Sequence, residues 1–575
     1  MVVSGTIGRA GIILLMLATS GRDLNGQTSP FDSGVSGQAA LIREHVDAFT
    51  DRSLYITGEV IRFRASVRCT GLSAREKWSN VFYVELLSAS GKSEAQGKFW
   101  IHDQVSTGEI AIPPDILTGN YFLKCYTRWM RNRDPEAYCY IPLRVINPYR
   151  PELSMGVQPG NGADHLVTRS VREHVLKFSE PSAVYMSEDS VFLNLIFSGM
   201  DGPGKAEGCL TVVPAEFKPK GQIQLAASRT EGSDDFGLQF LPDRFGATLS
   251  GTVLNPDLEE QPVKDVRIHF TMMGDQSAYF VTRSDAYGKF SVTLPNREGK
   301  VELLVQPENP GDTSLIVRID QDFDQREVYL PAEPFRLSQT EKQLVTTMAR
   351  KLQLARIYGN IDSLQEAGIP VDQVPFYGLP TFSLNMDDFV LLPTLEEVLI
   401  NLVPDVSPVI RKKRAFLSIT SENPILSMFD PLIMIDQVPF FNMKEFFSVP
   451  TDRISKIDVV NDIYLKGDMR YGGIVNIRTI EKDMAGIDLP DNAFFIDFTA
   501  FCPHSGERSE TVSKNDQMPD TRNTLLWIPE LRVEQGNPTP VSFTAPDYPG
   551  EYVVLFRGLD DQGEPVSAET RIVVR

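Results

Sequence analysis

Cysteine, histidine and tryptophan are scarce in this sequence, and their scarcity excludes several kinds of protein. Only 5 cysteines, 6 histidines and 4 tryptophans occur among 575 residues. The cysteines are Cys69, Cys125, Cys139, Cys209 and Cys502. They are too few and too scattered for a disulfide-dense scaffold or for a zinc site with paired ligands. Cys125 and Cys139 lie on two strand-like runs, where they either form a cross-strand bridge or remain buried thiols, and the sequence does not decide between these outcomes.

Motifs that carry catalysis are also missing. The six histidines stand alone, without an H-E-x-x-H or H-x-H pair for zinc: His45, His102, His165, His174, His269 and His504. The sequence has no G-x-S-x-G nucleophile elbow, no phosphate-cradling G-x-x-x-x-G-K-[ST] and no Cys-Gly-Glu-Gln thioester tetrad. We therefore predict a protein that is not an enzyme, with no catalytic residues, no cofactor and no metal site.

Long hydrophobic runs and an excess of basic residues are absent as well. No run approaches the roughly 20 apolar residues that a membrane-spanning helix needs. The net charge is −20, with 76 acidic residues against 56 basic ones, which argues against a nucleic-acid-binding protein. With 42% hydrophobic residues the chain can still form sizeable cores, and its length suggests about four domains.

The first residues predict an export signal. Arg9 supplies a positive charge, the run Ile12–Ala18 is apolar but too short to span a membrane, and Gly26 precedes Gln27 at a small-residue cleavage point. No cysteine closely follows the apolar run, so a lipoprotein anchor is not expected. We predict a signal peptide over residues 1–26 and an exported protein, either periplasmic or associated with the outer membrane.

Residues 27–150 predict a first β-sandwich, because apolar and polar residues alternate with the period of half-buried strands. Asp51–Phe63 reads D-R-x-x-Y-x-x-G-E-x-I-x-F, and Gly119–Asn132 reads G-x-Y-x-L-x-x-Y-T-x-W-M-x-N. Both patterns resemble macroglobulin-type (MG) β-sandwich domains, and another immunoglobulin-like sandwich is the alternative. We expect three core residues and one turn residue here: Tyr55, Ile61, Phe63 and Gly58.

Two further segments predict separate β units. Within residues 165–232, Val184–Leu195 repeats the entry into the first domain, with an aromatic residue, a turn and then a strand, and it resembles a second, partial macroglobulin-like unit. The tail, residues 490–575, resembles the terminal sandwich of macroglobulin-containing proteins. Its strand-like runs are Leu525–Pro529, Pro540–Phe543, Gly550–Phe556 and Ala568–Val574.

Between these two segments, residues 243–333 predict another β-sandwich. Thr282–Phe290 reads T-x-x-D-x-x-G-x-F and resembles the hairpin of carboxypeptidase-regulatory-like domains. In that turn Gly288 is expected to take a positive φ, and Asp285 to hydrogen-bond the turn backbone. We expect a structural role for Asp285 and no calcium site, because further oxygen ligands at loop spacing are missing.

A helix is expected to link these β modules to the next domain, within residues 334–375. The stretch Ser338–Glu341 is a capping box, and the apolar residues after it keep helical spacing. Gly359 fits the position just past the helix end. The pattern therefore predicts a linking helix over Ser338–Tyr358.

Residues 376–486 predict a small α/β domain. Three apolar runs separated by turns are expected to pair in one sheet: Leu432–Ile435, Ile454–Val460 and Ile474–Ile477. Pro431–Pro439 reads P-L-x-x-x-D-x-V-P and Tyr471–Thr479 reads Y-G-G-I-V-N-I-R-T, and together they resemble the plug domain of TonB-dependent outer-membrane receptors. Gln437 stands where that family has glycine, so we expect its turn to take another geometry.

The chain is too short to add a barrel to this plug-like domain, so we expect no transporter. Thr394–Leu402 is expected to form a helix that covers the apolar face of the sheet, which would let the domain fold alone. Four polar side chains on its strands are expected to meet water or a partner: Lys456, Asp458, Asn476 and Arg478.

These patterns predict a mainly β fold class: tandem immunoglobulin- or macroglobulin-like β-sandwiches with a small α/β plug-like domain and a linking helix. The combined resemblance is to envelope proteins of Bacteroidetes-type bacteria. It implies a non-enzymatic multidomain protein that acts in protein or glycan binding, or in assembly, at the outer membrane. One alternative is an accessory component of TonB-dependent transport whose plug-like domain docks a separate barrel. Another is a protease-related protein, either inhibitor or peptidase. The implied partner is an envelope protein and not nucleic acid.

Overall fold

The structure is a computed structural model that is mainly β, with few helices. It describes residues 39–71, 78–150, 152–154, 176–181, 184–197, 204–223, 225, 238–274, 277–308, 315–331, 334–357, 375–411, 414–502 and 520–575. None of the described helices is long and apolar enough to cross a membrane. The predicted signal peptide lies outside the described residues.

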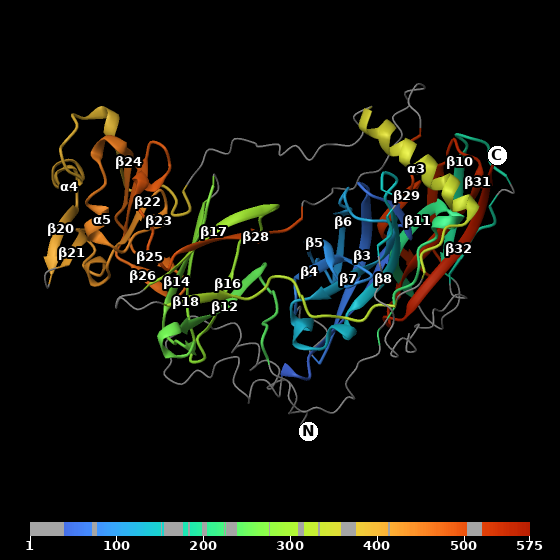
Figure 1. Cartoon of the computed structure of the whole chain (residues 1–575), viewed down its shortest axis with the longest axis horizontal. Helices are drawn as coiled ribbons and strands as arrows, with labels where there is room; N and C mark the ends of the chain where they lie inside the picture. Colours follow the sequence, from blue (N-terminus) through green and yellow to red (C-terminus); the bar gives the residue numbers. More distant parts are fainter. Residues whose placement is uncertain are drawn as a thin grey trace. The chain divides into compact units, whose positions relative to one another are not determined.

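The chain divides into two compact units that are both discontinuous in sequence (Figure 1). The double-sandwich unit takes Ser33–Gly246, Phe323–Glu366 and Phe501–Arg575. The mixed unit takes Ala247–Asp322 and Ala367–Ala500. From the first described residue, Ala39, to the C-terminus, the chain therefore passes between the two units four times.

The first sandwich of the double-sandwich unit has two sheets. One has the order β1 (Arg43–Thr50), β3 (Val60–Thr70), β6 (Val105–Ala111), and the other has the order β2 (Leu54–Ile56), β8 (Cys139–Ile146), β7 (Gly119–Thr127), β4 (Val81–Ser88), β5 (Ser93–Trp100). Tyr55, Ile61 and Phe63 are fully buried, and Gly58 takes a φ of 85°. The predicted core and turn residues are confirmed.

The D-R-x-x-Y-x-x-G-E motif forms a buried polar knot at the edge of this sandwich. The Tyr55 hydroxyl donates to Asp51 Oδ1 at 2.6 Å, and Arg52 Nη2 lies 2.9 Å from Glu59 Oε1. Thr524 Oγ1, from the C-terminal segment, donates to Asp51 Oδ2 at 2.6 Å. The motif residues therefore hold their own turn and also contact the tail of the chain.

The second sandwich corrects the prediction that 165–232 and 490–575 form separate units, because their strands share both sheets. One sheet has the order β30 (Thr539–Thr544), β10 (Ser190–Phe197), β9 (Leu176–Phe178), and the other has the order β29 (Leu526–Glu534), β11 (Lys205–Pro214), β31 (Gly550–Asp560), β32 (Pro565–Val574). Figure 1 shows β11 beside β31. Two or three strands cannot bury an apolar face alone, so each segment completes the other.

Helix α3 (Gln339–Ile357) also differs from its predicted role as a linker. The capping box is confirmed: Glu341 N donates to Ser338 Oγ at 3.1 Å, and Ser338 N donates to Glu341 Oε2 at 2.8 Å. Its inner face is buried in one core cluster with both sandwiches: Val345, Met348, Leu352, Leu54, Ile56, Ile146, Val213 and Phe217. The helix is therefore part of the double-sandwich unit. Gly359 lies outside the described residues.

The first part of the mixed unit has two four-stranded sheets. One has the order β13 (Gln261–Pro262), β12 (Thr248–Asn255), β16 (Lys289–Thr293), with β18 (Ile316–Ile319) also paired to β12. The other has the order β15 (Ala278–Arg283), β14 (Arg267–Met272), β17 (Lys300–Pro307), β28 (Phe494–Thr499). Strand β28 was predicted to belong to the C-terminal sandwich, but it pairs with β17 instead.

The Thr282–Phe290 turn is confirmed in its details but not as a hairpin of one sheet. Gly288 has a φ of 69°, and Asp285 Oδ1 accepts from the backbone of Tyr287 and Lys289, both at 2.9 Å. Strands β15 and β16, on either side of the turn, lie in different sheets. The turn therefore carries the chain from one sheet to the other.

The second part of the mixed unit is a five-stranded sheet. Its order is β19 (Phe382–Asn385), β24 (Ile454–Val460), β27 (Ile474–Thr479), β22 (Leu432–Ile435), β23 (Val438–Pro439). Helix α4 (Leu395–Leu402) packs on one face, with Leu395, Val398 and Leu399 in the same core cluster as Ile457 and Ile477. The pairing of the three predicted strands and the covering helix are confirmed. Smaller elements complete this part: β20 (Val406–Arg411), β21 (Arg414–Ile419), α5 (Met443–Phe446), β25 (Tyr464–Lys466) and β26 (Met469–Tyr471).

The opposite face of this sheet is also buried, which the sequence did not predict. Leu432, Met434 and Ile474 share a core cluster with Tyr279 and Val281 of β15. Two of the four polar residues expected to meet water or a partner are buried, Asp458 at 1% and Asn476 at 0% exposure. Asp458 accepts a hydrogen bond from the Tyr377 hydroxyl at 3.0 Å, and Arg478 and Lys456 lie 3.0 and 3.4 Å from its carboxylate.

The turn at Gln437 corrects another prediction. Asp436 and Gln437 take φ values of 49° and 69°, so Gln437 adopts the left-handed geometry that favours glycine. Asp436 Oδ1 accepts from Thr479 N at 2.7 Å, and Gln437 N donates to Asn476 Oδ1 at 3.0 Å. These hydrogen bonds hold Asp436 and Gln437 in the left-handed conformation, which costs free energy for any residue that has a side chain.

Candidate functional site

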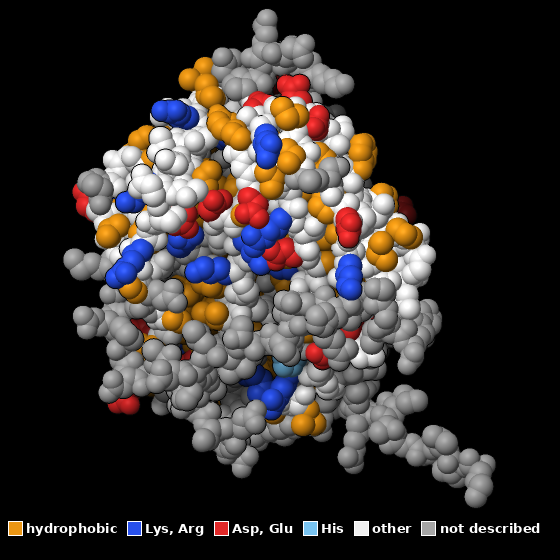
Figure 2. Space-filling view, turned by 90° about the vertical axis from the view of Figure 1, so that its right-hand side faces the viewer, with side chains coloured by type: hydrophobic (Ala, Val, Ile, Leu, Met, Phe, Trp, Pro, Cys, Tyr) orange, Lys and Arg blue, Asp and Glu red, His pale blue; other side chains and the backbone are white. Residues whose placement is uncertain are grey.

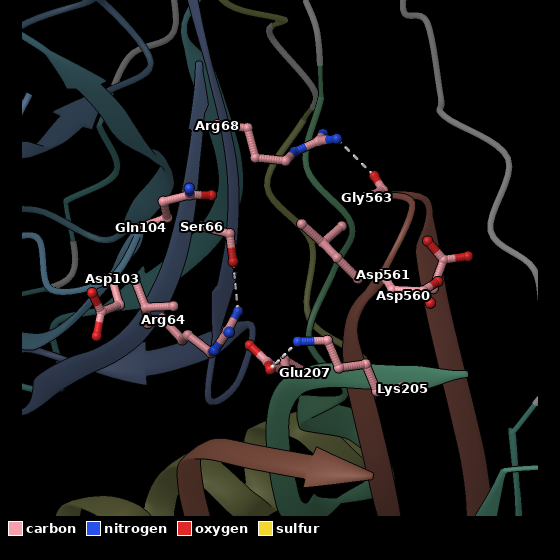
Figure 3. Close-up of a pocket in the computed structure, with 12 residues that line it drawn as sticks. Arg64, Ser66, Arg68, Asp103, Gln104, Lys205, Glu207, Asp560, Asp561 and Gly563 are labelled. Carbon is pink, nitrogen blue, oxygen red and sulfur yellow. Dashed lines mark hydrogen bonds and ion pairs between the residues drawn. The ribbon is translucent and has the colours of Figure 1, made fainter. Parts of the chain in front are cut away.

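A cavity of about 220 Å³ lies within the double-sandwich unit, where the two sandwiches meet (Figure 3). Strand β3 contributes Arg64, Ser66 and Arg68 to one wall, and the turn between β5 and β6 lies beside them. Strand β11 and the turn between β31 and β32 form the other side, with Glu207 and Gly563. The cavity therefore exists only because the C-terminal strands pack against β11.

Arg64 is the buried cation of this cavity. Residues 64, 66 and 68 share one face of β3 because strand side chains alternate with a period of two. Arg64 is 2% exposed, its Nη1 donates to Ser66 Oγ at 2.8 Å, and its buried Nε has no hydrogen-bond partner among the described residues. Burial lowers the pKa of Arg64 from its ordinary value, and no carboxylate among the described residues lies within 4.0 Å of it.

Four other charged groups of the cavity already have partners: Arg68, Lys205, Glu207 and Asp560. Arg68 Nη2 lies 2.6 Å from Asp47 Oδ2, and its Nη1 donates to the Gly563 carbonyl at 2.8 Å (Figure 3). Lys205 Nζ lies 3.3 Å from Glu207 Oε1. Asp560 accepts from two backbone N–H groups of its own turn, those of Gln562 and Glu564.

Exposed apolar side chains also occur in the mixed unit, in the segment just before α4, on α4 itself and on β20. Three consecutive residues before α4 are 46%, 87% and 55% exposed: Phe389, Val390 and Leu391. Ile400 on α4 and Ile410 on β20, which contacts α4, are exposed as well. We call these five residues the apolar edge.

A buried polar chain joins the two parts of the mixed unit. His269 Nδ1 lies 2.7 Å from the Tyr279 hydroxyl, which lies 2.8 Å from the Tyr471 hydroxyl. His269 Nε2 lies 3.5 Å from Glu308 Oε2. Burial lowers the pKa of His269, so its ring is neutral near pH 7. We interpret this chain as structural, since each hydroxyl fills a buried position between β14, β15 and β26.

The outer face of the five-stranded sheet in the first sandwich carries charged and aromatic residues that are fully covered. Lys124 Nζ lies 3.0 Å from Glu85 Oε1, and both side chains are 2% exposed. The rings of Tyr83, Tyr126 and Tyr138 stack in a row, with centroids 5.4 and 4.7 Å apart. Residues of the covering segments reach this row: Asp243 accepts from Tyr83, and Asp324 accepts from Tyr138.

Asp324 has an unusually low pKa in this covered face. Burial opposes ionisation, but hydrogen bonds from Arg326 and Tyr138 outweigh it and lower the pKa to about 2. Asp324 therefore stays ionised at neutral pH, and the segment that returns from the mixed unit is held on the sheet by charged groups.

The cysteines and histidines form no metal centre among the residues described. No three His, Cys, Asp or Glu side chains come together there as metal ligands. Cys125 and Cys139 are direct partners across β7 and β8, and both are buried free thiols whose pKa values burial raises. His165, His174 and His504 lie outside the described residues.

The sequence alone predicted no site residue, neither Arg64 nor the residues of the apolar edge. The alternation Arg62-Phe63-Arg64-Ala65-Ser66 was readable as a strand, with arginines opposite Phe63. The sequence signal for this site is that Arg64, Ser66 and Arg68 fall on one face of the strand. What covers that face depends on residues about 500 positions away, which no local pattern reveals.

No protein-family model matches the sequence, and no curated protein matches it. Among solved structures, Salmonella alpha-2-macroglobulin reacted with methylamine is 10% identical, with 92% of this chain and 39% of that chain covered and a TM-score of 0.22. Escherichia coli alpha-2-macroglobulin activated by porcine elastase is 10% identical, with 92% and 44% covered and a TM-score of 0.23. Dimeric latent PorU from Porphyromonas gingivalis is 10% identical, with 48% and 33% covered and a TM-score of 0.15.

This chain spans about two fifths of the length of those macroglobulins. The chain is distantly similar in structure to bacterial alpha-2-macroglobulins, and TM-scores this low carry no conclusion about function.

Proposed function

We propose that this chain is a non-catalytic, protein-binding component of the bacterial cell envelope. In this proposal the double-sandwich unit is a structural body, and the mixed unit binds a partner protein through the apolar edge. The observation that carries the proposal is the run Phe389–Leu391, three consecutive large apolar residues left in solvent. Exposed apolar groups of this kind mark interaction surfaces when they gather.

Chemistry favours a protein partner over a glycan. Aliphatic side chains such as Val390, Leu391 and Ile400 offer no hydrogen-bond donors or acceptors to sugar hydroxyls. They gain free energy when an apolar partner surface removes them from water. By contrast, on the face of the molecule shown in Figure 2 hydrophobic side chains are scattered among positive and negative ones.

The envelope location rests on the leader at residues 1–26, whose composition is that of an export signal. Scarce cysteine and a net charge of −20 fit an exported acidic protein. The family resemblances stay part of the proposal: macroglobulin-like for the first sandwich, regulatory-like for residues 243–333 and plug-like for 376–486. The polar knot at Asp51–Glu59 and the turn at Asp285–Gly288 support the first two.

Site-specific photo-crosslinking in living cells tests this proposal. A benzophenone amino acid at Val390, which is 87% exposed, should give one discrete cross-linked species with a second protein. The same probe at Tyr329, which is 84% exposed in the double-sandwich unit, serves as the matched control and should give none.

Phe389→Ser with Leu391→Ser should abolish the cross-link from Val390 and leave expression and thermal unfolding unchanged, because both side chains are largely outside the core. Equal cross-linking from Val390 and Tyr329, or none from either, would contradict a binding role for the apolar edge.

A further inference from the structure

We propose that the cavity between the two sandwiches binds a small oxyanion group, either a carboxylate or a phosphate, which Arg64 holds. This site is independent of the apolar edge, since the two lie in different units. The geometry that points to it is a buried arginine at the wall of a cavity: the Arg64 residue is 2% exposed, and its Nε has no acceptor among the described residues.

A buried cation without a counterion is costly, because burial removes its hydration and nothing in the interior replaces it. Two other buried cations of this unit have a carboxylate within ion-pair distance: Arg52 pairs with Glu59 and Lys124 pairs with Glu85. The Arg64 guanidinium hydrogen-bonds the Ser66 hydroxyl, and Glu530 and Glu207 act on its charge only from beyond ion-pair distance. An oxyanion in the cavity would form the direct ion pair that Arg64 lacks and accept from the guanidinium, which suits carboxylate and phosphate oxygens.

None of the acidic residues that line the cavity forms a direct ion pair with Arg64, although Glu207 acts on its charge from a longer distance. Glu207 is paired with Lys205 at 3.3 Å, and Asp560 is held by the backbone of its own turn. Asp561, at the mouth, is exposed. These carboxylates disfavour a highly charged anion, so the expected ligand carries one or two negative charges at most.

The dimensions of the cavity fit a small ligand. Its 220 Å³ would hold about seven water molecules, which is enough for an oxyanion with a short substituent. Gly563 lines the opposite side, and a Cβ there would lie 2.3 Å from Arg68 Nη1. The tight turn at Gly563 therefore keeps Arg68 in place beside Arg64.

Titration of the full-length protein with sodium phosphate and with sodium acetate, against sodium chloride at equal ionic strength, tests the proposal. Calorimetry should show saturable binding of at least one of the two oxyanions, and the unfolding temperature should rise with its concentration. A response to phosphate alone or to acetate alone identifies which group the site takes.

Arg64→Met removes the charge but keeps a side chain of similar length. We expect it to weaken binding by about tenfold or more, because a charge-assisted hydrogen bond is lost. Without any anion, the same variant should unfold at a higher temperature than the parent, since it no longer buries an unpaired cation. Arg532→Gln, which changes an exposed arginine paired with Glu534, is the control and should bind as the parent does.

Glu207→Gln is a second test of anion binding. The Glu207 side chain is 45% exposed, so we expect this variant to fold as the parent does. Removing that negative charge should tighten anion binding several-fold. No saturable binding of either anion, or binding that Arg64→Met leaves unchanged, would overturn the proposal.

Discussion

A fragment of residues 376–486 is expected to fail to fold on its own. The helix-covered face of its sheet would remain packed, but Leu432, Met434 and Ile474 on the other face would lose their cover from Tyr279 and Val281. The hydroxyl contact between Tyr279 and Tyr471 would be lost with it. This expectation reverses the one drawn from sequence, which treated the segment as an independent domain.

The measurement is cooperative thermal unfolding, followed by circular dichroism, together with binding of an apolar dye. Residues 376–486 alone should show no sharp transition and should bind the dye. A chain that joins 247–322 to 367–500 by a flexible linker is the matched control, and it should unfold cooperatively. A sharp transition for residues 376–486 alone would contradict this expectation, because it would show that the sheet folds without Tyr279 and Val281 packed on its second face.

Glu85→Gln should destabilise the double-sandwich unit by about 3–5 kcal/mol, because it removes the carboxylate that lies 3.0 Å from the buried Lys124 ammonium. Glu85 also accepts from the Tyr126 hydroxyl at 2.9 Å and from Gln96 Nε2 at 2.8 Å, so the change disturbs a satisfied network. Urea unfolding at neutral pH measures the decrease in the free energy of unfolding, which is calculated from the midpoint and slope of the transition.

Glu94→Gln is the matched control, since Glu94 pairs with Lys92 at 2.8 Å and the Lys92 side chain is 71% exposed. Such a surface pair contributes about 0–1 kcal/mol, so little stability should be lost. Glu85→Leu with Lys124→Met removes both charges and should lose less stability than Glu85→Gln alone. If Glu85→Gln and Glu94→Gln cost the same, the buried pair does not stabilise the covered face as described.

Local patterns predicted most elements of this fold but few of their partners. The alternation in Val191-Phe192-Leu193 predicts a half-buried strand, and β10 is one. Its pairing with β30 depends on residues about 350 positions away, and register between distant strands is set by the faces they bury together. For the same reason the sequence predicted α3 as a helix but not the core against which it packs.

Tertiary contacts outweigh the local preference of the sequence at several other residues. Gln437 takes a positive φ because its backbone N–H and the side-chain carboxylate of Asp436 are held by hydrogen bonds to β27, a strand about 40 residues further along the chain. The strand alternation predicts that the side chains of Asp458 and Asn476 face solvent, but both are buried. The Tyr377 hydroxyl hydrogen-bonds both side chains, and Arg478 also forms an ion pair with Asp458. The sequence does not single out Arg64, because a lone arginine on a strand is ordinarily exposed to solvent.

One sandwich is built from residues 176–217 and 526–574 together, and an engineered disulfide between the two segments tests this pairing. Phe192 and Ser542 are direct partners across β10 and β30, and both face solvent. Cysteines at directly opposite positions are close enough to bridge. Phe192→Cys with Ser542→Cys should therefore oxidise to a disulfide that joins the two peptides in a digest. Phe192→Cys with Glu534→Cys, on the other sheet, should not. Equal bridging in both pairs, or none in the first, would contradict the shared sandwich.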